Sequence, residues 1–204
     1  DPVKKSIPVV LYQDWDFFLV IAYGKIIPKD ILEIPRLGVL NVHPSLLPKY
    51  RGPTPIQTAI LNGDETTGVS IMLLDEEVDH GPILSQKELD NFPACAEASA
   101  GRQLSIFNYQ LLSNALAELG AEMLIEILPK YVRGKITPVP QDHAKATYTK
   151  KFTIEDTFVP YEDLIAALGC NSEKTRRIDR MIRALNPEPG VWTKTTDKQV
   201  FNFL

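Results

Sequence analysis

Runs of apolar residues separated by polar, proline-containing turns dominate the first half of the chain. Residues 17–23 (FFLVIAY) form a continuous apolar run closed by Gly24, and residues 38–44 (GVLNVHP) form a shorter one. Short runs rich in β-branched and aromatic residues are typical of strands buried on both faces of a parallel sheet. The runs at 67–75 and 82–89 predict two further strands, the last of them antiparallel at a sheet edge.

Two helices are predicted between and after these strands. Thr54 and Pro55 read as an N-cap followed by proline at the first helical position, with a helix to about Leu61 and Gly63 as its stop. A long helix is predicted over residues 105–128. Its apolar positions recur every three or four residues and define one stripe: Tyr109, Leu112, Leu116, Leu119, Met123 and Ile127.

Strands alternating with helices predict an α/β domain with a mostly parallel sheet. One connection does not fit this pattern. Only residues 13–16 separate the apolar run 6–12 (SIPVVLY) from the run 17–23, whereas a crossover between parallel strands needs about a dozen residues. Either the two runs form a hairpin or a helical segment is absent, and we favour absence.

The second half has a different texture. Residues 143–160 are polar and extended and predict a linker, after which short helices are expected at 161–168 and 173–185. The strand-like segment from residue 191 to the end is expected to have nothing local to pair with. An unpaired strand edge favours pairing with other chains and aggregation, so folded domains usually cover it. We therefore divide the chain into a first domain (1–142), the linker (143–160) and the start of an unfinished domain (161–204).

Composition and charge narrow the function class. The chain has 204 residues, 44% of them hydrophobic and 24% charged, and a net charge of −4, which argues against a protein built wholly around nucleic acid. No apolar run approaches the roughly 18 residues of a membrane span, and no secretion signal is recognisable. We expect a cytoplasmic protein in which Cys95 and Cys170 are free thiols.

Candidate chemistry lies at the end of the second strand. Ligands of open α/β sheets bind outside the carboxyl ends of strands, and Asn41 and His43, two residues apart, face the same side there. Asn supplies a fixed donor for a developing oxyanion, and His titrates near neutral pH. A carboxylate should orient the His. Four candidates occur in the acidic turn 75–79: Asp75, Glu76, Glu77 and Asp79, the last beside Gly81.

These features also have ordinary structural explanations, and other kinds of site lack support. An isolated Asn-x-His is a weak signal, and an acidic run is most often a solvated turn. Ser45 as a nucleophile lacks the G-x-S-x-G elbow. His80 and His143 have no metal-ligand spacing with His43, so no metal site is expected. No glycine-rich phosphate loop is present.

The segment NVHPSLLPKYRGPTPIQTAILNGDETTGVSIMLLDEEVDHGPIL resembles the core of the folate-dependent formyltransferases. In that family an N-x-H-x-S-L-L-P segment is followed about 36 residues after the His by the second Asp of a D-x-x-x-D-x-G loop, as His43 is by Asp79 here. Three flanking segments, YRGPTPIQ, ITPVPQDHAKATYTKKFT (136–153) and IDRMIRALNPEPGVWT, are similar to the linker and barrel entry of the branch that acts on methionyl-tRNA. His80 departs from the Thr of many relatives, and Glu188 from a common aromatic.

The resemblance implies a Rossmann-like α/β domain and transfer of a formyl group from 10-formyltetrahydrofolate to the amine of methionyl-tRNA for translation initiation. The catalytic residues it implies are Asn41, His43 and Asp79, with the proton-transfer roles of His43 and Asp79 left open. Two further sets of residues come with it. The folate-binding set is Ser45, Leu46, Leu47, Pro48, Ile21, Ala22, Tyr23, Asp75 and Val78. The tRNA set is Lys49 and Arg51, with a second basic group formed by Lys174, Arg176, Arg177, Arg180 and Arg183.

The resemblance also implies a monomer without a metal or a membrane contact, and a last segment that begins a C-terminal tRNA-binding β-barrel. Relatives carry further N-terminal and C-terminal parts, which would account for the short connection at 13–16 and for the unpaired strand. Two alternatives stay open: an N-formyltransferase acting on a sugar or another small amine, and a folate-binding remnant without catalysis. For Lys49 and Arg51, and for the second basic group, a solvated basic surface is the alternative.

Overall fold

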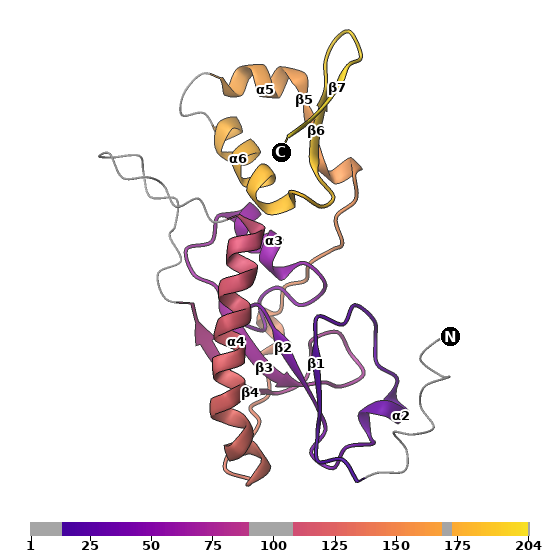
Figure 1. Cartoon of the computed structure of the whole chain (residues 1–204), viewed down its shortest axis with the longest axis vertical. Helices are drawn as coiled ribbons and strands as arrows, with labels where there is room; N and C mark the ends of the chain where they lie inside the picture. The colour runs from indigo at the N-terminus through magenta and orange to yellow at the C-terminus, as the bar shows by residue number, and fades with distance from the viewer. Residues whose placement is uncertain (1–13, 90–107, 169–172, 204) are drawn as a thin grey trace, which may run out of the picture.

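The computed structural model describes residues 14–89, 108–168 and 173–203. The predicted strand at 6–12, Cys95 and Cys170 lie outside them. The described residues form two separate sheets, one of four strands in the order β1-β2-β3-β4 and one of three in the order β5-β6-β7. The two sheets lie at opposite ends of an elongated molecule (Figure 1).

All four strands predicted in the first half are present. They are β1 (Phe18–Ile21), β2 (Val39–His43), β3 (Gly68–Leu73) and β4 (Ile83–Glu88), with the short helix α2 (Lys29–Leu32) between the first two. The expectation of a mostly parallel sheet is wrong for these strands. β1 and β2 are parallel, but β2–β3 and β3–β4 are antiparallel. Apolar runs predict that strands are buried and carry no information on their direction.

Helix α4 (Tyr109–Val132) covers one face of this sheet, along its β3 and β4 side (Figure 1). The predicted apolar stripe is buried from its second member onward: Leu112, Leu116, Leu119, Met123 and Ile127 are all less than 9% exposed. Burial of one such side chain stabilises the fold by about 1.5–3 kcal/mol. Gly120 lies where the helix comes closest to β2, since a Cβ there would stand 2.8 Å from a methyl carbon of Val42.

Helix α3 (Pro55–Asn62) begins and ends near the predicted residues. Gly63 adopts the left-handed conformation (φ 66°) that commonly ends a helix. Thr54 does not cap the helix through its side chain. Its hydroxyl instead donates to the carbonyl oxygen of Lys150 at 2.7 Å, so Thr54 ties α3 to the linker.

The second sheet corrects the expectation of an unpaired final strand. β6 (Val191–Lys194) pairs in parallel with β5 (Phe158–Pro160) and antiparallel with β7 (Val200–Phe203). β5 is too short to give a periodic pattern, and the sequence did not reveal it. Helices α5 (Tyr161–Ala167) and α6 (Glu173–Leu185) pack beside this sheet.

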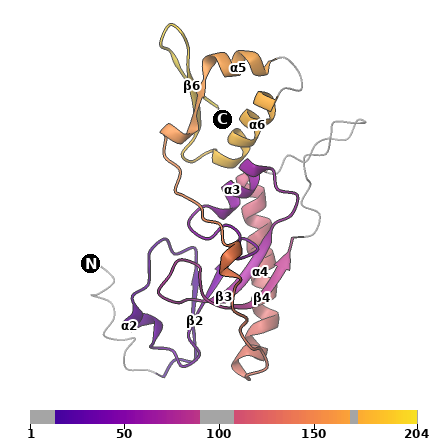
Figure 2. The same ribbon diagram turned by 180° about the vertical axis from the view of Figure 1, so that it is seen from behind.

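The expected linker (143–160) holds two turns of 3-10 helix and ends in β5, and neither it nor the residues just before it form a free tether. Main-chain hydrogen bonds of 2.8 Å join Val139 to Ile83 at the start of β4. After a single turn of 3-10 helix, η2 (His143–Lys145), a parallel bridge joins Tyr148 to Arg51. A second turn, η3 (Glu155–Thr157), leads into β5. Figure 2 shows this segment running along the molecule from the first sheet to the second.

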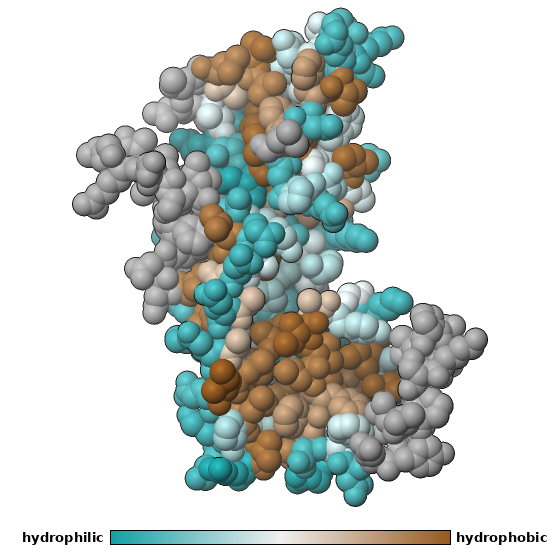
Figure 3. All heavy atoms as spheres, in the orientation of Figure 1, coloured by the Kyte–Doolittle hydropathy of each residue, from teal (hydrophilic) through white to brown (hydrophobic). Residues whose placement is uncertain are grey.

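Strand β1 leaves apolar side chains on the surface. Leu19 is 40% exposed and Ile21 58% exposed, and Trp15, Tyr23 and Val78 are also exposed. A broad hydrophobic area in the lower part of Figure 3 lies over this end of the first sheet. The residues predicted as a strand buried on both faces are therefore covered on one side only within the described part of the chain.

Candidate functional site

Strand β2 and the loop after β3 bring Asn41, His43 and Asp79 together. Side chains alternate along a strand, so Asn41 and His43 share one face of β2 while Val42 faces α4. Asp79 lies in the loop between β3 and β4, and β3 is the antiparallel neighbour of β2. The three predicted catalytic residues are thus neighbours in space.

One carboxylate oxygen of Asp79 serves both partners. Asp79 Oδ1 lies 3.5 Å from Asn41 Nδ2, which donates to it, and 3.6 Å from His43 Nδ1. The other oxygen, Oδ2, accepts a short hydrogen bond of 2.7 Å from the main-chain N–H of Gly52. Gly52 therefore fixes the carboxylate through Oδ2, while the Asn41 amide and the His43 imidazole face Oδ1.

His43 is held by the protein at both ring nitrogens. Its Nε2 lies 2.9 Å from the carbonyl oxygen of Tyr50. Because a carbonyl can only accept, Nε2 carries the hydrogen, and Nδ1 faces Asp79. The side chain of His43 is 5% exposed and that of Asp79 13% exposed. Of the two, the carboxylate is the more accessible to a reacting group.

Two non-glycine residues of this site have left-handed backbone conformations. Tyr50 has φ 62° and Asp79 has φ 47°. This conformation costs roughly 1–2 kcal/mol per residue for L-amino acids and persists only where neighbouring contacts hold it. In each case the strained residue presents a polar group to His43, the carbonyl of Tyr50 and the carboxylate of Asp79.

The predicted folate loop 45–48 is only partly accessible. Ser45 is 1% and Leu47 is 3% exposed. The hydroxyl of Ser45 donates to the Lys49 carbonyl, and Leu47 N–H donates to the hydroxyl of Ser70. These contacts make Ser45 and Leu47 interior anchors of the loop, contrary to the expectation that they form the ligand wall. Leu46 and Pro48 are half-buried.

The other predicted folate residues lie at the ends of β1 and β3. Strand register places Val20 beside Asn41 and Ile21 beside Val42, so the segment Ile21–Tyr23 emerges at the same edge as the predicted catalytic residues of β2. Ile21, Tyr23 and Val78 are exposed, and Ala22 has φ 52°. Asp75 is occupied by His80, whose Nδ1 lies 2.6 Å from Asp75 Oδ2.

Arg51 does not have the surface position predicted for a tRNA contact. It is 1% exposed. Its guanidinium donates twice to Gln141 Oε1, at 3.1 and 2.7 Å, once to Tyr148 Oη at 3.2 Å, and lies 2.9 Å from His143 Nδ1. A guanidinium enclosed in this way has no face left for a phosphate. Lys49 remains on the surface, paired with Asp64 at 2.7 Å.

Two features of the site were not foreseen. The imidazole rings of His80 and His143 stack at 4.0 Å with an interplanar angle of 8°, and the side chain of Gln141 bridges Arg51 to the Asp79 loop. These contacts join residues about 60 to 90 positions apart, and neither Gln141 nor His143 belongs to a motif. The similarity of the segment 136–153 to the linker of the family was the one available signal.

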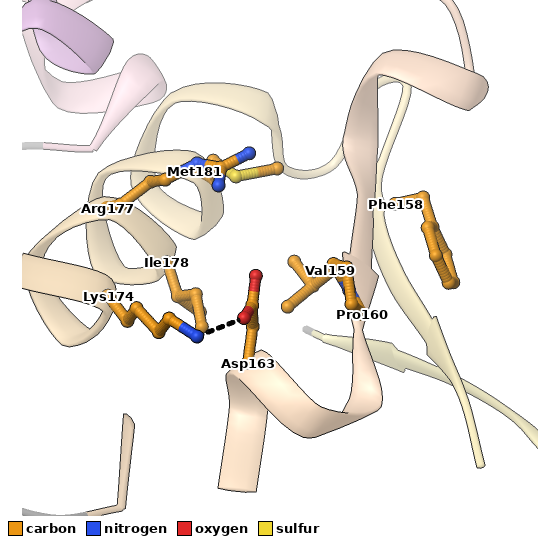
Figure 4. A pocket seen from close by; sticks show the side chains of 8 residues that line it. All are labelled: Phe158, Val159, Pro160, Asp163, Lys174, Arg177, Ile178 and Met181. Carbon is orange, nitrogen blue, oxygen red and sulfur yellow. Dashed lines mark hydrogen bonds and ion pairs between the residues drawn. The ribbon is translucent and has the colours of Figure 1, made fainter. Parts of the chain in front are cut away.

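The basic group on α6 is partly engaged within the chain. Lys174 pairs with Asp163 of α5 at the edge of a small pocket (Figure 4). Arg183 pairs with Asp179, and Arg180 donates to the carbonyl oxygen of Asn62 at 3.4 Å. Arg176 and Arg177 are exposed.

No group of three or more His, Cys, Asp or Glu side chains in residues 14–89, 108–168 and 173–203 is arranged to hold a metal ion. Within the same ranges, none of the helices combines the length and the apolar character that crossing a bilayer requires.

The chain is similar in sequence and in fold to known formyltransferases. The chain is 45% identical over 178 residues, 87% of its length, to a methionyl-tRNA formyltransferase of Roseiflexus sp. (strain RS-1). It spans about half (48%) of that relative. Among solved structures, a 4-N formyltransferase from Francisella tularensis superposes with a TM-score of 0.71 at 18% identity, covering 98% of this chain and 74% of the other.

A second solved structure carries a ligand. HypX from Aquifex aeolicus, in complex with tetrahydrofolic acid, superposes with a TM-score of 0.65 at 22% identity, over 88% of this chain and 27% of that one. At such identities the two structures support the fold alone. The family model described as formyl transferase matches residues 7–116, more than half of the chain, and that range contains Asn41, His43 and Asp79. The chain therefore belongs to the formyl transferase family.

Proposed function

We propose that this chain is part of an enzyme that transfers a formyl group from 10-formyltetrahydrofolate to the amino group of methionyl-tRNA. The observation that carries the proposal is that Asn41 Nδ2 and His43 Nδ1 both face the same carboxylate oxygen of Asp79. The 45% identity to a methionyl-tRNA formyltransferase supports the choice of acceptor. The sugar and small-amine alternative is supported by likeness of fold alone, to a sugar N-formyltransferase from Shewanella sp. at 18% identity.

Asn41 is suited to stabilise the charge that develops on the formyl oxygen. Its amide cannot ionise, and only one of its two N–H groups is directed at Asp79, over a long 3.5 Å contact. The other N–H is left to donate to an oxyanion as the acceptor amine attacks the formyl carbon. Loss of one such donor costs about 10²–10³ in kcat in other acyl-transfer enzymes.

Asp79 is suited to take the proton that the amine loses. The new carbon–nitrogen bond forms while the bond from the formyl carbon to the folate nitrogen breaks, and that nitrogen takes up one proton as the acceptor amine gives one up. Both nitrogens of His43 already face protein groups, whereas Asp79 is partly exposed. In this assignment Gly52 N–H holds the carboxylate and Asp79 takes the proton. Nδ1 of His43, which carries no hydrogen while Nε2 donates to Tyr50, then faces the protonated carboxyl as an acceptor.

The donor, when bound, supplies the formyl group. The residues suited to hold it line the edge where β1 and β2 end: the exposed apolar side chains of Ile21, Tyr23 and Val78, and the half-buried Leu46 and Pro48. Together they offer apolar surface for a flat ring beside the reacting centre. Ser45 and Leu47 support this surface from inside.

The substrate assignment is tested by offering two acceptors with 10-formyltetrahydrofolate. The protein is expected to formylate methionyl-tRNA and to leave an amino-sugar nucleotide unchanged. The reverse result would move the chain to the sugar-modifying group. Tetrahydrofolate binding without turnover on either acceptor would identify a folate-binding remnant, provided that full-length protein with the family's remaining segments is also inactive.

The catalytic assignment is tested by Asn41→Ala, His43→Ala and Asp79→Asn. Each is expected to lower kcat, Asn41→Ala by roughly 10²–10³, while the dissociation constant for tetrahydrofolate changes little because none of the three lines the proposed apolar surface. Asn114→Ala, at an exposed position on α4, serves as the control and should keep kcat near wild type. Wild-type turnover in all three site variants would place the chemistry elsewhere.

A further inference from the structure

The side chain of Gln141 is a buried link between two loops of the proposed active site. It is 6% exposed and uses its whole hydrogen-bonding capacity. Its Nε2 donates to the main-chain carbonyl of Asp79 at 2.9 Å and to that of Gly81 at 2.7 Å. Its Oε1 accepts two bonds from Arg51. An amide with both hydrogens and its oxygen engaged is fixed in one orientation.

The loop that Gln141 holds needs such support. Asp79 has φ 47°, a left-handed conformation that is unfavourable for a residue with a Cβ. Gly81 approaches β3 closely, because a Cβ there would stand 2.1 Å from the carbonyl oxygen of Leu73. The two carbonyls that accept from Gln141 belong to these two residues, so the bonds act on the strained part of the loop.

The Arg51 side of the link leads back to the same carboxylate. Arg51 precedes Gly52, whose N–H donates to Asp79 Oδ2 at 2.7 Å. The contacts thus form a closed circuit, in which Gln141 binds both the guanidinium of Arg51 and the backbone of Asp79, and the residue after Arg51 binds the Asp79 carboxylate. A displacement of Gln141 would loosen both attachments of Asp79 at once.

Two main-chain anchors, one on each side of Gln141 in the sequence, hold the segment 139–149 in this position. Val139, two residues earlier, is paired with Ile83 through two main-chain hydrogen bonds of 2.8 Å. Seven residues later, Tyr148 bridges to Arg51, and Thr149 N–H donates to the Arg51 carbonyl at 2.8 Å. The polar side chain between these two anchors is therefore held against the catalytic loops on both flanks.

We propose that Gln141 is a positioning residue for formyl transfer, which sets the Asp79 carboxylate opposite Asn41 and His43. The inference rests on the proposed function, because it assumes that Asp79 accepts the proton. Gln141 touches no reacting atom in this scheme and acts through Asp79. Active groups displaced by as little as 1 Å can lose about 10²-fold in rate, so a link of this kind has a measurable effect on turnover.

Gln141→Glu is the informative variant because it keeps the size of the side chain and an acceptor for Arg51 but removes both donors to the loop. We expect kcat to fall about 10- to 100-fold, with KM for the folate within about twofold. The amide proton of Gly52, which reports its bond to the carboxylate, should move upfield in the NMR spectrum and exchange faster. This resonance can be followed whether or not the protein turns over.

Asn186→Asp is the matched control. Asn186 also bridges main-chain groups through its amide, accepting from Val191 N–H and donating to the Phe203 carbonyl, but it does so in the second sheet. The Asn186→Asp substitution should lower the free energy of unfolding without changing kcat or the Gly52 resonance. Gln141→Asn, which keeps the amide but withdraws it by one methylene, is the second variant if Gln141→Glu does not fold.

The outcomes separate the inference from the function on which it rests. A Gly52 resonance and a kcat that stay at wild-type values in a folded Gln141 variant would overturn the positioning role. A loss of unfolding free energy with kcat unchanged would also overturn it and leave a structural glutamine. If wild-type protein formylates no amine, yet Gln141→Glu still shifts the Gly52 resonance, the link to Asp79 stands and the proposed function fails.

Discussion

Arg51 carries a positive charge that the protein surrounds with neutral acceptors. Its partners are the amide of Gln141, the hydroxyl of Tyr148 and a ring nitrogen of His143, which accepts and so bears no hydrogen. A buried charge is tolerated only where its donors are satisfied. Because hydrogen bonds to a charged group contribute about 1.5–3 kcal/mol each, this residue is a structural centre of the site.

Replacement of Arg51 should therefore unfold the protein more easily. In Arg51→Met the buried amide oxygen of Gln141 loses both of its donors, whereas the exposed Tyr148 and His143 can turn to water. A buried unsatisfied group costs about 1–3 kcal/mol, and we expect the free energy of unfolding in urea to fall by this amount. Arg176→Met, on the exposed side of α6, should stay within about 0.5 kcal/mol of wild type. Equal effects of the two substitutions would contradict the structural role of Arg51.

Ionisation of Tyr131 should make the free energy of unfolding sensitive to alkaline pH. Burial raises the pKa of Tyr131 above its ordinary value of 10.0, and its hydroxyl donates to the Leu37 carbonyl at 2.5 Å. Below pH 10 the hydroxyl is neutral in both states, and its contribution to stability is complete. Above pH 10 the unfolded chain ionises first, so the free energy of unfolding falls as the pH rises.

The test compares wild type with Tyr131→Phe across the alkaline range. The variant should be less stable by about 1 kcal/mol at pH 8, because the Leu37 carbonyl loses its partner. The difference between the two proteins should shrink between pH 9 and 11. A difference that stays constant over this range would show that ionisation of Tyr131 does not contribute.

At the scale of elements, contact between α4 and β2 is set by Gly120. Its missing side chain admits Val42, the residue between Asn41 and His43. In Gly120→Ala a gain in helix propensity of up to about 1 kcal/mol opposes an overpacking cost of about 1–3 kcal/mol. We expect a net loss of about 1 kcal/mol of unfolding free energy and, since β2 is displaced, a lower kcat.

A double-mutant cycle isolates this contact. Val42→Ala removes the methyl group against which the new Cβ collides, so Gly120→Ala should be less harmful in that background. The double variant is expected to be at least about 1 kcal/mol more stable than the sum of the two single effects. Simple additivity would mean that the helix and the strand are not in contact there.

Gly63 joins α3 to α6, and so the first half of the molecule to the second. A Cβ at Gly63 would stand 2.2 Å from the guanidinium of Arg180, which donates to the Asn62 carbonyl. Gly134 has nearly the same φ, 68° against 66°, but a Cβ there would meet nothing within 4 Å. Comparing alanine substitutions at Gly63 and Gly134 therefore separates the cost of backbone strain from the cost of displacing the Arg180 side chain.

Alanine at either glycine should cost about 1 kcal/mol of unfolding free energy for the left-handed backbone. Gly63→Ala should cost about 0.5 kcal/mol more, because the hydrogen bond of Arg180 is lost. Combination with Arg180→Ala should remove the excess. Equal losses at the two glycines would show that Arg180 moves aside freely.

The parts of the fold that the sequence predicted are those with a local signal. Apolar runs located β1 to β4, period 3.6 located α4, and strand alternation put Asn41 and His43 on one face. Strand direction and the pairing of β6 with β5 depend on partners distant in the chain and could not be predicted. β7 follows β6 directly, and this local hairpin was not predicted either. Arg51 was misassigned because arginine is usually exposed, and nothing near it in sequence indicates its partners at 141, 143 and 148.

At the scale of the whole molecule, the exposed apolar surface over β1 bears on solution behaviour. Leu19 and Ile21 lie on a strand that pairs on one side only within the described residues. Exposed apolar edges favour association. Leu19→Lys should therefore reduce concentration-dependent light scattering of this chain. Leu111→Lys, which changes a more isolated exposed leucine on α4, should not, and equal effects of the two would contradict a role for β1.

The course of the linker has a practical consequence for recombination between relatives. A chimera joined at residue 142 would take Gln141 from one parent and His143, Thr147, Tyr148 and Thr149 from the other, although all of them contact the Arg51 loop or its immediate neighbours. A junction placed after Lys150 would keep this set together with β2 and the Asp79 loop. The smallest unit that can be exchanged without dividing these contacts therefore ends at about Lys150, inside the expected linker.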